Sequence, residues 1–155
     1  MSASPAWWAK LGLSLGLIGY GAAASMGVPG IPLGRELLAP PYAAGAGLAV
    51  AGGSIELSHY VILKRKARAL GRPSELVTGG GLLRWVRHPM YLGDLVMLTG
   101  FAGLAGDGLA WGLWLLAVAC VVQQTRLEDR LLGQAFGPRH AAWAARTKLL
   151  VPWVY

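Results

Sequence analysis

Four apolar segments, separated by short polar stretches, constrain the fold of this chain more than any other feature. The first two are each long enough to cross a hydrocarbon core of about 30 Å as an α-helix that rises about 1.5 Å per residue. The third and fourth are short for full spans, and the fourth is expected to continue as helix through the polar stretch TRLEDRLL. The four segments are Trp7–Val28, Tyr42–Leu63, Met90–Ala105 and Leu109–Gln123.

The composition is that of a membrane protein. Of the 155 residues, 55% are hydrophobic and 14% are charged, and the mean hydropathy is +0.49, whereas soluble domains are about 45–50% apolar. Strand signals are negligible, and the single cysteine, Cys120, allows no disulfide and no cysteine-based metal site. The sequence therefore predicts an all-α integral membrane protein, with residues 1–155 in a single membrane domain of about four transmembrane helices. The tight link Gly106-Asp107-Gly108 makes the last two a helical hairpin.

Basic residues gather on one side of the predicted membrane. The positive-inside rule then places both termini and the long middle loop in the cytoplasm. We expect a multi-pass protein of a prokaryotic inner membrane. The net charge of +7 would suggest nucleic acid on a soluble protein, but here the bases flank apolar segments, so lipids are expected as partners and nucleic acid is not. The basic residues are Lys64, Arg65, Lys66, Arg68, Arg72, Arg84 and Arg87 before the third segment, and Arg126, Arg130, Arg139, Arg146 and Lys148 after the fourth.

Two glycine pairs have the spacing that lets helix backbones approach closely, namely Gly12 with Gly16 and Gly108 with Gly112. We expect them to pack within one bundle rather than to form a homodimer. The protein is therefore expected to be a monomer or a weak homodimer.

The stretch GGGLLRWVRHPMYLGD, residues 79–94, crowds polar side chains against the start of the third apolar segment. Pro89 suits the first turn of a helix, because its missing N–H would be unpaired there anyway. The free N–H groups of that turn follow directly after Arg87 and His88, and the three glycines let backbone come close to a ligand. These features favour an anionic group at the membrane boundary. Alternatively, the arginines contact lipid headgroups and the aromatic residues form an interfacial belt.

A second polar cluster, residues 125–153, follows the fourth segment. Glu128 and Asp129 lie on the side that otherwise collects arginine and lysine, so they need a partner, either an arginine or the positive part of a ligand. The sequence FGP, residues 136–138, breaks the helix, and His140 and Trp143 then share one face of a short helix. The alternative is a salt-bridged amphipathic tail that lies on the membrane.

Two ionisable residues lie inside the second apolar segment, Glu56 and His59, one helical turn apart. Ionisable side chains within a membrane are costly and suggest function. They could line a substrate cavity, with His59 as a base, or they could satisfy each other within the bundle. Asp94, one turn into the third segment, could have a catalytic role or pair with an arginine.

Taken in order, these features resemble the isoprenylcysteine carboxyl methyltransferase and phospholipid methyltransferase superfamily of integral membrane enzymes. The resemblance covers about Val77–Trp153 and leaves the first two segments without a motif. The second family glutamate is replaced by Asp129, and the two family tyrosines are replaced by His140 and Trp143. The matching residues are Arg87, His88, Pro89, Tyr91 and Gly93 for RHPxYxG, then Glu128, Leu131 or Leu132, Phe136 and Gly137.

The resemblance implies a methyltransferase that uses S-adenosylmethionine. The chain lacks a βαβ pattern with GxGxxG, which excludes a soluble Rossmann-type methyltransferase. Residues 77–155 would hold the cofactor in a pocket closed by the cytoplasmic helical tail, and residues 1–76 would form the acceptor side. The acceptor stays open as a lipid-like or small hydrophobic carboxylate, amine or thiol. The alternative is a non-enzymatic membrane transporter or assembly factor on the same scaffold.

The residue pattern and the family resemblance together give the candidate site residues, and no metal site is expected. The cofactor-binding candidates are Gly80, Arg87, His88, Pro89, Tyr91, Gly93, Glu128, Asp129, His140 and Trp143, and the catalytic candidates are Glu56, His59 and Arg87.

Overall fold

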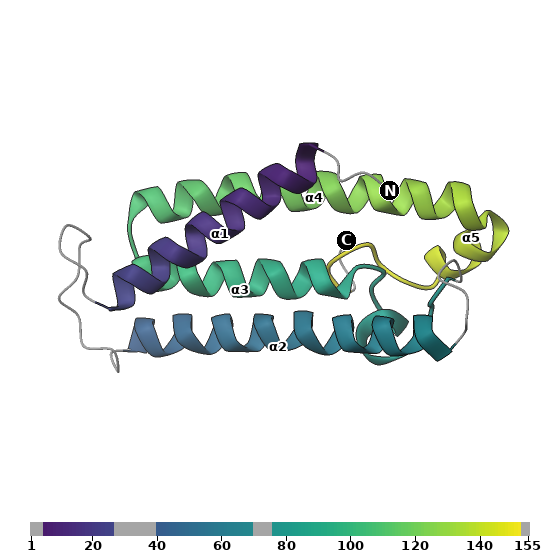
Figure 1. Cartoon of the computed structure of the whole chain (residues 1–155), viewed down its shortest axis with the longest axis horizontal. Coiled ribbons are helices and arrows are strands. Elements are labelled where there is room, and N and C mark those ends of the chain that lie inside the picture. The colour runs from purple at the N-terminus through teal and green to yellow at the C-terminus, as the bar shows by residue number, and fades with distance from the viewer. Residues whose placement is uncertain (1–4, 27–39, 70–75, 153–155) are drawn as a thin grey trace.

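The computed structural model describes residues 5–26, 40–69 and 76–152. Within these ranges the protein is all-helical, as predicted, and the only β-type pairing there is an isolated parallel bridge between Val86 and Lys148. Figure 1 shows the long helices side by side, with α5 folded back at the end of α4. The elements are α1 (Pro5–Ser25), α2 (Pro40–Ala69), the 3-10 turn η1 (Gly81–Arg84), α3 (Pro89–Ala105), α4 (Gly108–Phe136) and α5 (Pro138–Ala144).

The helix α3 is the centre of the bundle and packs against α1, α2 and α4. Its closest approach is to α2, because glycines leave no side chain between the two backbones. A Cβ added to Gly52 would lie 2.2 Å from the backbone nitrogen of Met97. The predicted pairs Gly12/Gly16 and Gly108/Gly112 do not make such contacts, since no other described part of the chain lies within 4 Å of a Cβ built on them. The prediction that they pack within the bundle is therefore wrong.

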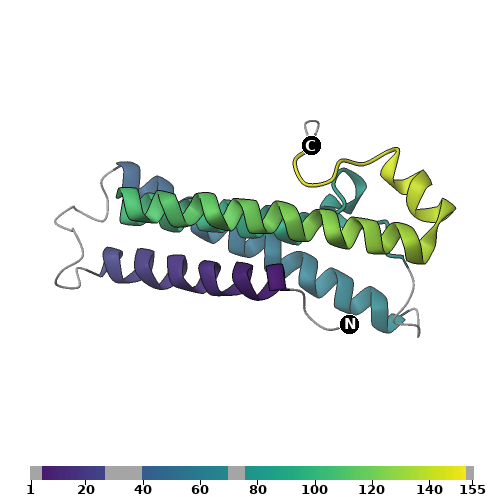
Figure 2. The same cartoon turned by 90° about the horizontal axis from the view of Figure 1, so that it is seen from above.

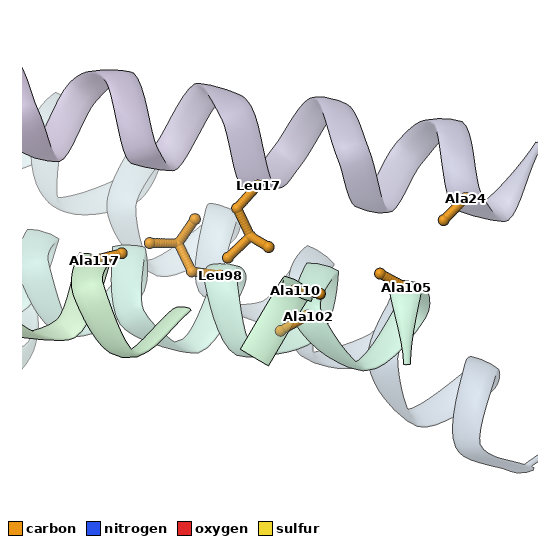
Figure 3. Close-up of a cluster of buried hydrophobic side chains, with 7 residues drawn as sticks. All are labelled: Leu17, Ala24, Leu98, Ala102, Ala105, Ala110 and Ala117. Carbon is orange, nitrogen blue, oxygen red and sulfur yellow. The ribbon is translucent and has the colours of Figure 1, made fainter. Parts of the chain in front are cut away.

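Small buried side chains hold α1 against the hairpin of α3 and α4 (Figure 3). The hairpin has the predicted short link. Gly106 ends α3 with a left-handed φ of 70°, and the Asp107 carboxylate accepts the N–H of Ala110 as the N-cap of α4. The same carboxylate accepts the hydroxyl of Tyr20, which ties α1 to the link. The buried cluster consists of Leu17, Ala24, Leu98, Ala102, Ala105, Ala110 and Ala117.

In the part of the chain that the structure describes, two helices are long and apolar enough to cross a membrane, Tyr42–Lys66 within α2 and Gly108–Phe136, which is all of α4. In the most apolar stretch of 18 residues of each helix, only 11% (α2) and 28% (α4) is buried inside the protein, whereas the core helix of a soluble protein is mostly buried. Exposed apolar side chains on these helices include Val50, Leu57 and Leu115. The helix α3 is a shorter apolar helix, and α4 extends through the polar stretch as predicted.

One end of the bundle carries most of the polar residues that the sequence singles out. Figures 1 and 2 both place η1, α5 and the start of α3 toward this end, where α2 and α4 finish. The segment before α3 and the segment after α5 pair through their backbones there. The N–H of Arg87 donates to the carbonyl of Lys148 at 2.8 Å, and the N–H of His88 donates to that of Leu149 at 3.2 Å.

Candidate functional site

A pocket of about 430 Å³ opens at this end of the bundle, which is within the size range of small-molecule sites. All four long helices contribute to its wall. Apolar side chains from α1, α2 and α3 cover part of it, including Trp7, Leu63 and Met90. The charged and polar residues that line it are Lys10, Glu56, Arg87, His88, Tyr91 and Glu128.

The Arg87 side chain makes hydrogen bonds that connect separate parts of the chain. Its Nε donates to Asp129 Oδ1 at 2.8 Å, and its Nη2 reaches Asp129 Oδ2 at 3.4 Å. Its Nη1 donates to the carbonyls of Ala144 at 3.1 Å and Thr147 at 2.8 Å. The guanidinium therefore joins the start of α3 to α4 and to the segment after α5. It lines the pocket, but most of its donors are already used.

His88 is a buried imidazole whose Nε2 makes no hydrogen bond to the described residues. This nitrogen lies 3.5 Å from Asp129 Oδ1, and Nδ1 lies 3.9 Å from Glu128 Oε2. Burial lowers the pKa of His88 below its usual range, although the two carboxylates act in the opposite direction. No side chain caps the helix that begins at Pro89. The helix start beside His88 thus has no side-chain cap, and such a helix start favours anionic groups.

Glu128 connects the two polar clusters directly. Its Oε1 accepts the hydroxyl of Tyr91 at 2.6 Å and the amide of Gln124 at 2.9 Å. Tyr91 lies 37 residues away along the chain. The Glu128 side chain is 35% exposed, so this carboxylate is open toward the pocket.

The residues from α5 lie behind the pocket wall. His140 Nε2 lies 3.1 Å from Asp129 Oδ1, and Trp143 Nε1 donates to the carbonyl of Leu83 at 3.2 Å. Both side chains are buried, and neither lines the pocket. They join α5 to α4 and η1. The structure therefore brings these two cofactor-binding candidates near the site without placing them in it.

The glycine stretch and His59 contact each other rather than the pocket. His59 Nε2 accepts the N–H of Leu82 at 2.9 Å, and its Nδ1 lies 2.9 Å from the carbonyl of Ile55. A Cβ on Gly81, whose φ is 53°, would lie 2.6 Å from His59 Nε2, so glycine is required there. Gly80 packs against Lys66 in the same way. These contacts dock η1 onto α2, and Glu56 is not the partner of His59.

Gly93, the last residue of the RHPxYxG match, belongs to the interface between α2 and α3. A Cβ added to it would lie 2.7 Å from the backbone nitrogen of Glu56 and 2.7 Å from the carbonyl oxygen of Gly52. Its place in the motif thus has a packing explanation. It positions α2 so that Glu56 faces the pocket.

Lys10 is the charged pocket residue that sequence reasoning missed. Lys10 Nζ pairs with Asp94 Oδ2 at 2.7 Å and lies 5.0 Å from the centre of the Tyr91 ring. The partner of Asp94 is thus a lysine from α1, not an arginine. The sequence did indicate that Lys10 has a partner, because it is the only charged residue of the first apolar segment and a charge there needs a partner.

Comparison with protein-family models, with curated proteins and with solved structures gives no match for this chain. Its function must therefore be inferred from its own residues and their geometry.

Proposed function

We propose that this chain is a membrane-embedded methyltransferase that uses S-adenosylmethionine to methylate a lipid-like or small hydrophobic acceptor. One observation carries the proposal. The two separate halves of the motif meet at one pocket, through the Tyr91–Glu128 hydrogen bond of 2.6 Å and the Arg87–Asp129 ion pair of 2.8 Å. The motif match alone does not require this convergence.

The pocket residues fit the groups of the cofactor. The cofactor supplies an electrophilic methyl group on a sulfonium. The uncapped start of α3 suits its carboxylate. The open carboxylate of Glu128 suits its ammonium or its ribose hydroxyls. The ring of Tyr91 already has one cation, Lys10, near it and offers the same attraction to a sulfonium.

The remaining residues hold the site in shape. Arg87 is held in the pocket wall by its bonds to Asp129 of α4 and to Thr147 in the segment after α5. Glu56 stands at the acceptor side of the wall and is the proton acceptor in this proposal. His59 contributes indirectly, because it docks η1 beside the pocket rather than touching a substrate.

The proposal also includes four membrane crossings with both termini cytoplasmic, in a prokaryotic inner membrane. The 21 residues of α1 span about 30 Å as a helix, and the 17 residues of α3 span about 25 Å. Exposed leucines and valines on α2 and α4 face outward, where lipid would cover them. The pocket then lies at the basic, cytoplasmic end, within reach of a soluble cofactor.

Calorimetry of S-adenosylmethionine binding to detergent-purified protein tests the function. We expect saturable binding to one site, and transfer of a deuterated methyl group into lipid extracts detected by mass spectrometry. A transporter or assembly factor on this scaffold would bind no cofactor. Absence of binding to a folded preparation, checked by circular dichroism, would remove the proposal.

A further inference from the structure

The charges around the pocket distinguish between the carboxylate, amine and thiol acceptors. Each cation of the wall already has an acidic partner, because Lys10 pairs with Asp94 and Arg87 pairs with Asp129. Glu56 pairs with neither. Among the described residues, no lysine or arginine lies within ion-pair distance of its carboxylate, and it accepts no hydrogen bond. A half-buried carboxylate without a partner is costly, so this position favours a cation.

Glu56 also stands where two cavities meet. It lines the pocket and a second, apolar groove of about 340 Å³ between α2 and α3. Met90 lines both cavities as well, while Gly53, Leu57 and Met97 belong to the groove alone. The Leu57 side chain is 64% exposed, so the groove opens on the outer face of α2. An elongated molecule in this groove would have its inner end at Glu56.

We propose that the groove and Glu56 form the acceptor site for an amphiphilic amine, with the apolar tail along α2 and the ammonium at Glu56. This inference rests on the proposed function, and it names the acceptor class. Lys10 also attracts Glu56 at longer range, but its ion pair is with Asp94, so an ammonium gains the attraction of a carboxylate that has no ion pair of its own among the described residues. A carboxylate acceptor would instead place a like charge next to Glu56 and near Asp94, and a neutral thiol would gain no charge partner.

The same residue meets a chemical need of an amine. An ammonium has no free lone pair, so it must lose a proton before it can act as a nucleophile. Glu56 accepts that proton. The nitrogen lone pair then forms a bond to the methyl carbon as the carbon–sulfur bond breaks, and that electron pair stays on sulfur. The positive charge passes from sulfur to nitrogen, and Glu56 releases its proton to water after the product leaves.

Binding of three matched amphiphiles, octylamine, octanoate and octanethiol, to the full chain in lipid nanodiscs tests the inference without cofactor. Native mass spectrometry reports which amphiphile is bound. We expect octylamine to bind tightest, and Glu56→Gln to weaken it about 10- to 150-fold, the range for loss of a charge-assisted contact. Ser54→Ala, an exposed change on the same helix, is the matched control and is expected to leave binding unchanged.

A second variant covers the case in which Glu56→Gln does not fold. Leu57→Trp at an exposed position narrows the groove and is expected to weaken octylamine binding at least tenfold while S-adenosylmethionine binding stays within about threefold. Octanoate binding as tightly as octylamine, or amine affinity unchanged in both variants, would overturn the inference. If the unmodified chain binds no S-adenosylmethionine, the proposed function is overturned instead. Failure of the inference and failure of the proposed function are therefore distinguishable.

Discussion

Replacing Glu128 with glutamine removes the one open carboxylate that connects both polar clusters. The Tyr91 hydroxyl and the Gln124 amide both donate to Oε1, and a glutamine carbonyl at the same place can accept both. The melting temperature of the cofactor-free protein is therefore expected to change little. The contact to a cofactor ammonium or hydroxyl loses its charge. Such contacts contribute about 1.5–3 kcal/mol, which corresponds to about a 10- to 150-fold weaker dissociation constant.

Calorimetry in detergent measures this change directly. Gln134→Ala, an exposed substitution further along α4, is the matched control and is expected to bind the cofactor like the unmodified chain. The stabilisation that saturating cofactor gives in a thermal melt is expected to shrink in Glu128→Gln by the same free energy. An unchanged dissociation constant would refute the reasoning, because the convergence of the two motif halves would then have no consequence for the ligand.

Three further substitutions separate structural roles from binding roles. Asp129→Asn weakens the partly buried pair with Arg87, so we expect a loss of about 1–3 kcal/mol in unfolding free energy, measured by chemical denaturation. Gly93→Ala places a Cβ against the backbone of α2 and is expected to lower the melting temperature by several degrees, whereas an alanine at a glycine with open space would not. The hydrogen bond from Tyr20 holds the pKa of Asp107 below its ordinary value of 3.8. The ionised carboxylate of Asp107 therefore stabilises the fold fully above pH 3.8, and this stabilisation is lost as the pH falls through the lower pKa of the folded state. The melting-temperature difference between the unmodified chain and Asp107→Asn is therefore expected to shrink below about pH 4, and a constant difference from pH 7 to pH 3 would contradict it.

Sequence features that act within a few residues predicted most of the helices. Where these features failed to predict a helix end, there is a physical reason. The start of α3 at Pro89 and the turn at Gly106 follow from backbone preferences that act within a few residues. The second apolar segment was predicted to end at Leu63, but α2 continues to Ala69. Apolarity marks the edge of a membrane segment, whereas the lysine, arginine and alanine that follow are good helix formers and extend the helix beyond it.

The site was only partly predictable, because contacts between distant segments decide it. Resemblance named Tyr91 and Glu128, and the fold brings them within 2.6 Å of each other. Resemblance also named His140 and Trp143, which stand where the family has tyrosines, yet here both are buried against neighbouring elements. Lys10 belongs to no motif. It reaches the pocket only because α1 crosses α3 at the level of Asp94.

The pairing between the start of α3 and the end of the described chain sets an order in which the molecule can assemble. The helices and the hairpin form from neighbouring segments, but Arg87 needs a carbonyl 60 residues further on before its donors are satisfied. Closing such a long loop costs conformational entropy, and this cost is offset only when the contacts at its ends have formed. The helices of the bundle can therefore form before Arg87 makes its contacts to the carbonyls of Ala144 and Thr147. We expect the segment after α5 to be fastened to the start of α3 late in folding, through the backbone pairs that Arg87 and His88 make with Lys148 and Leu149.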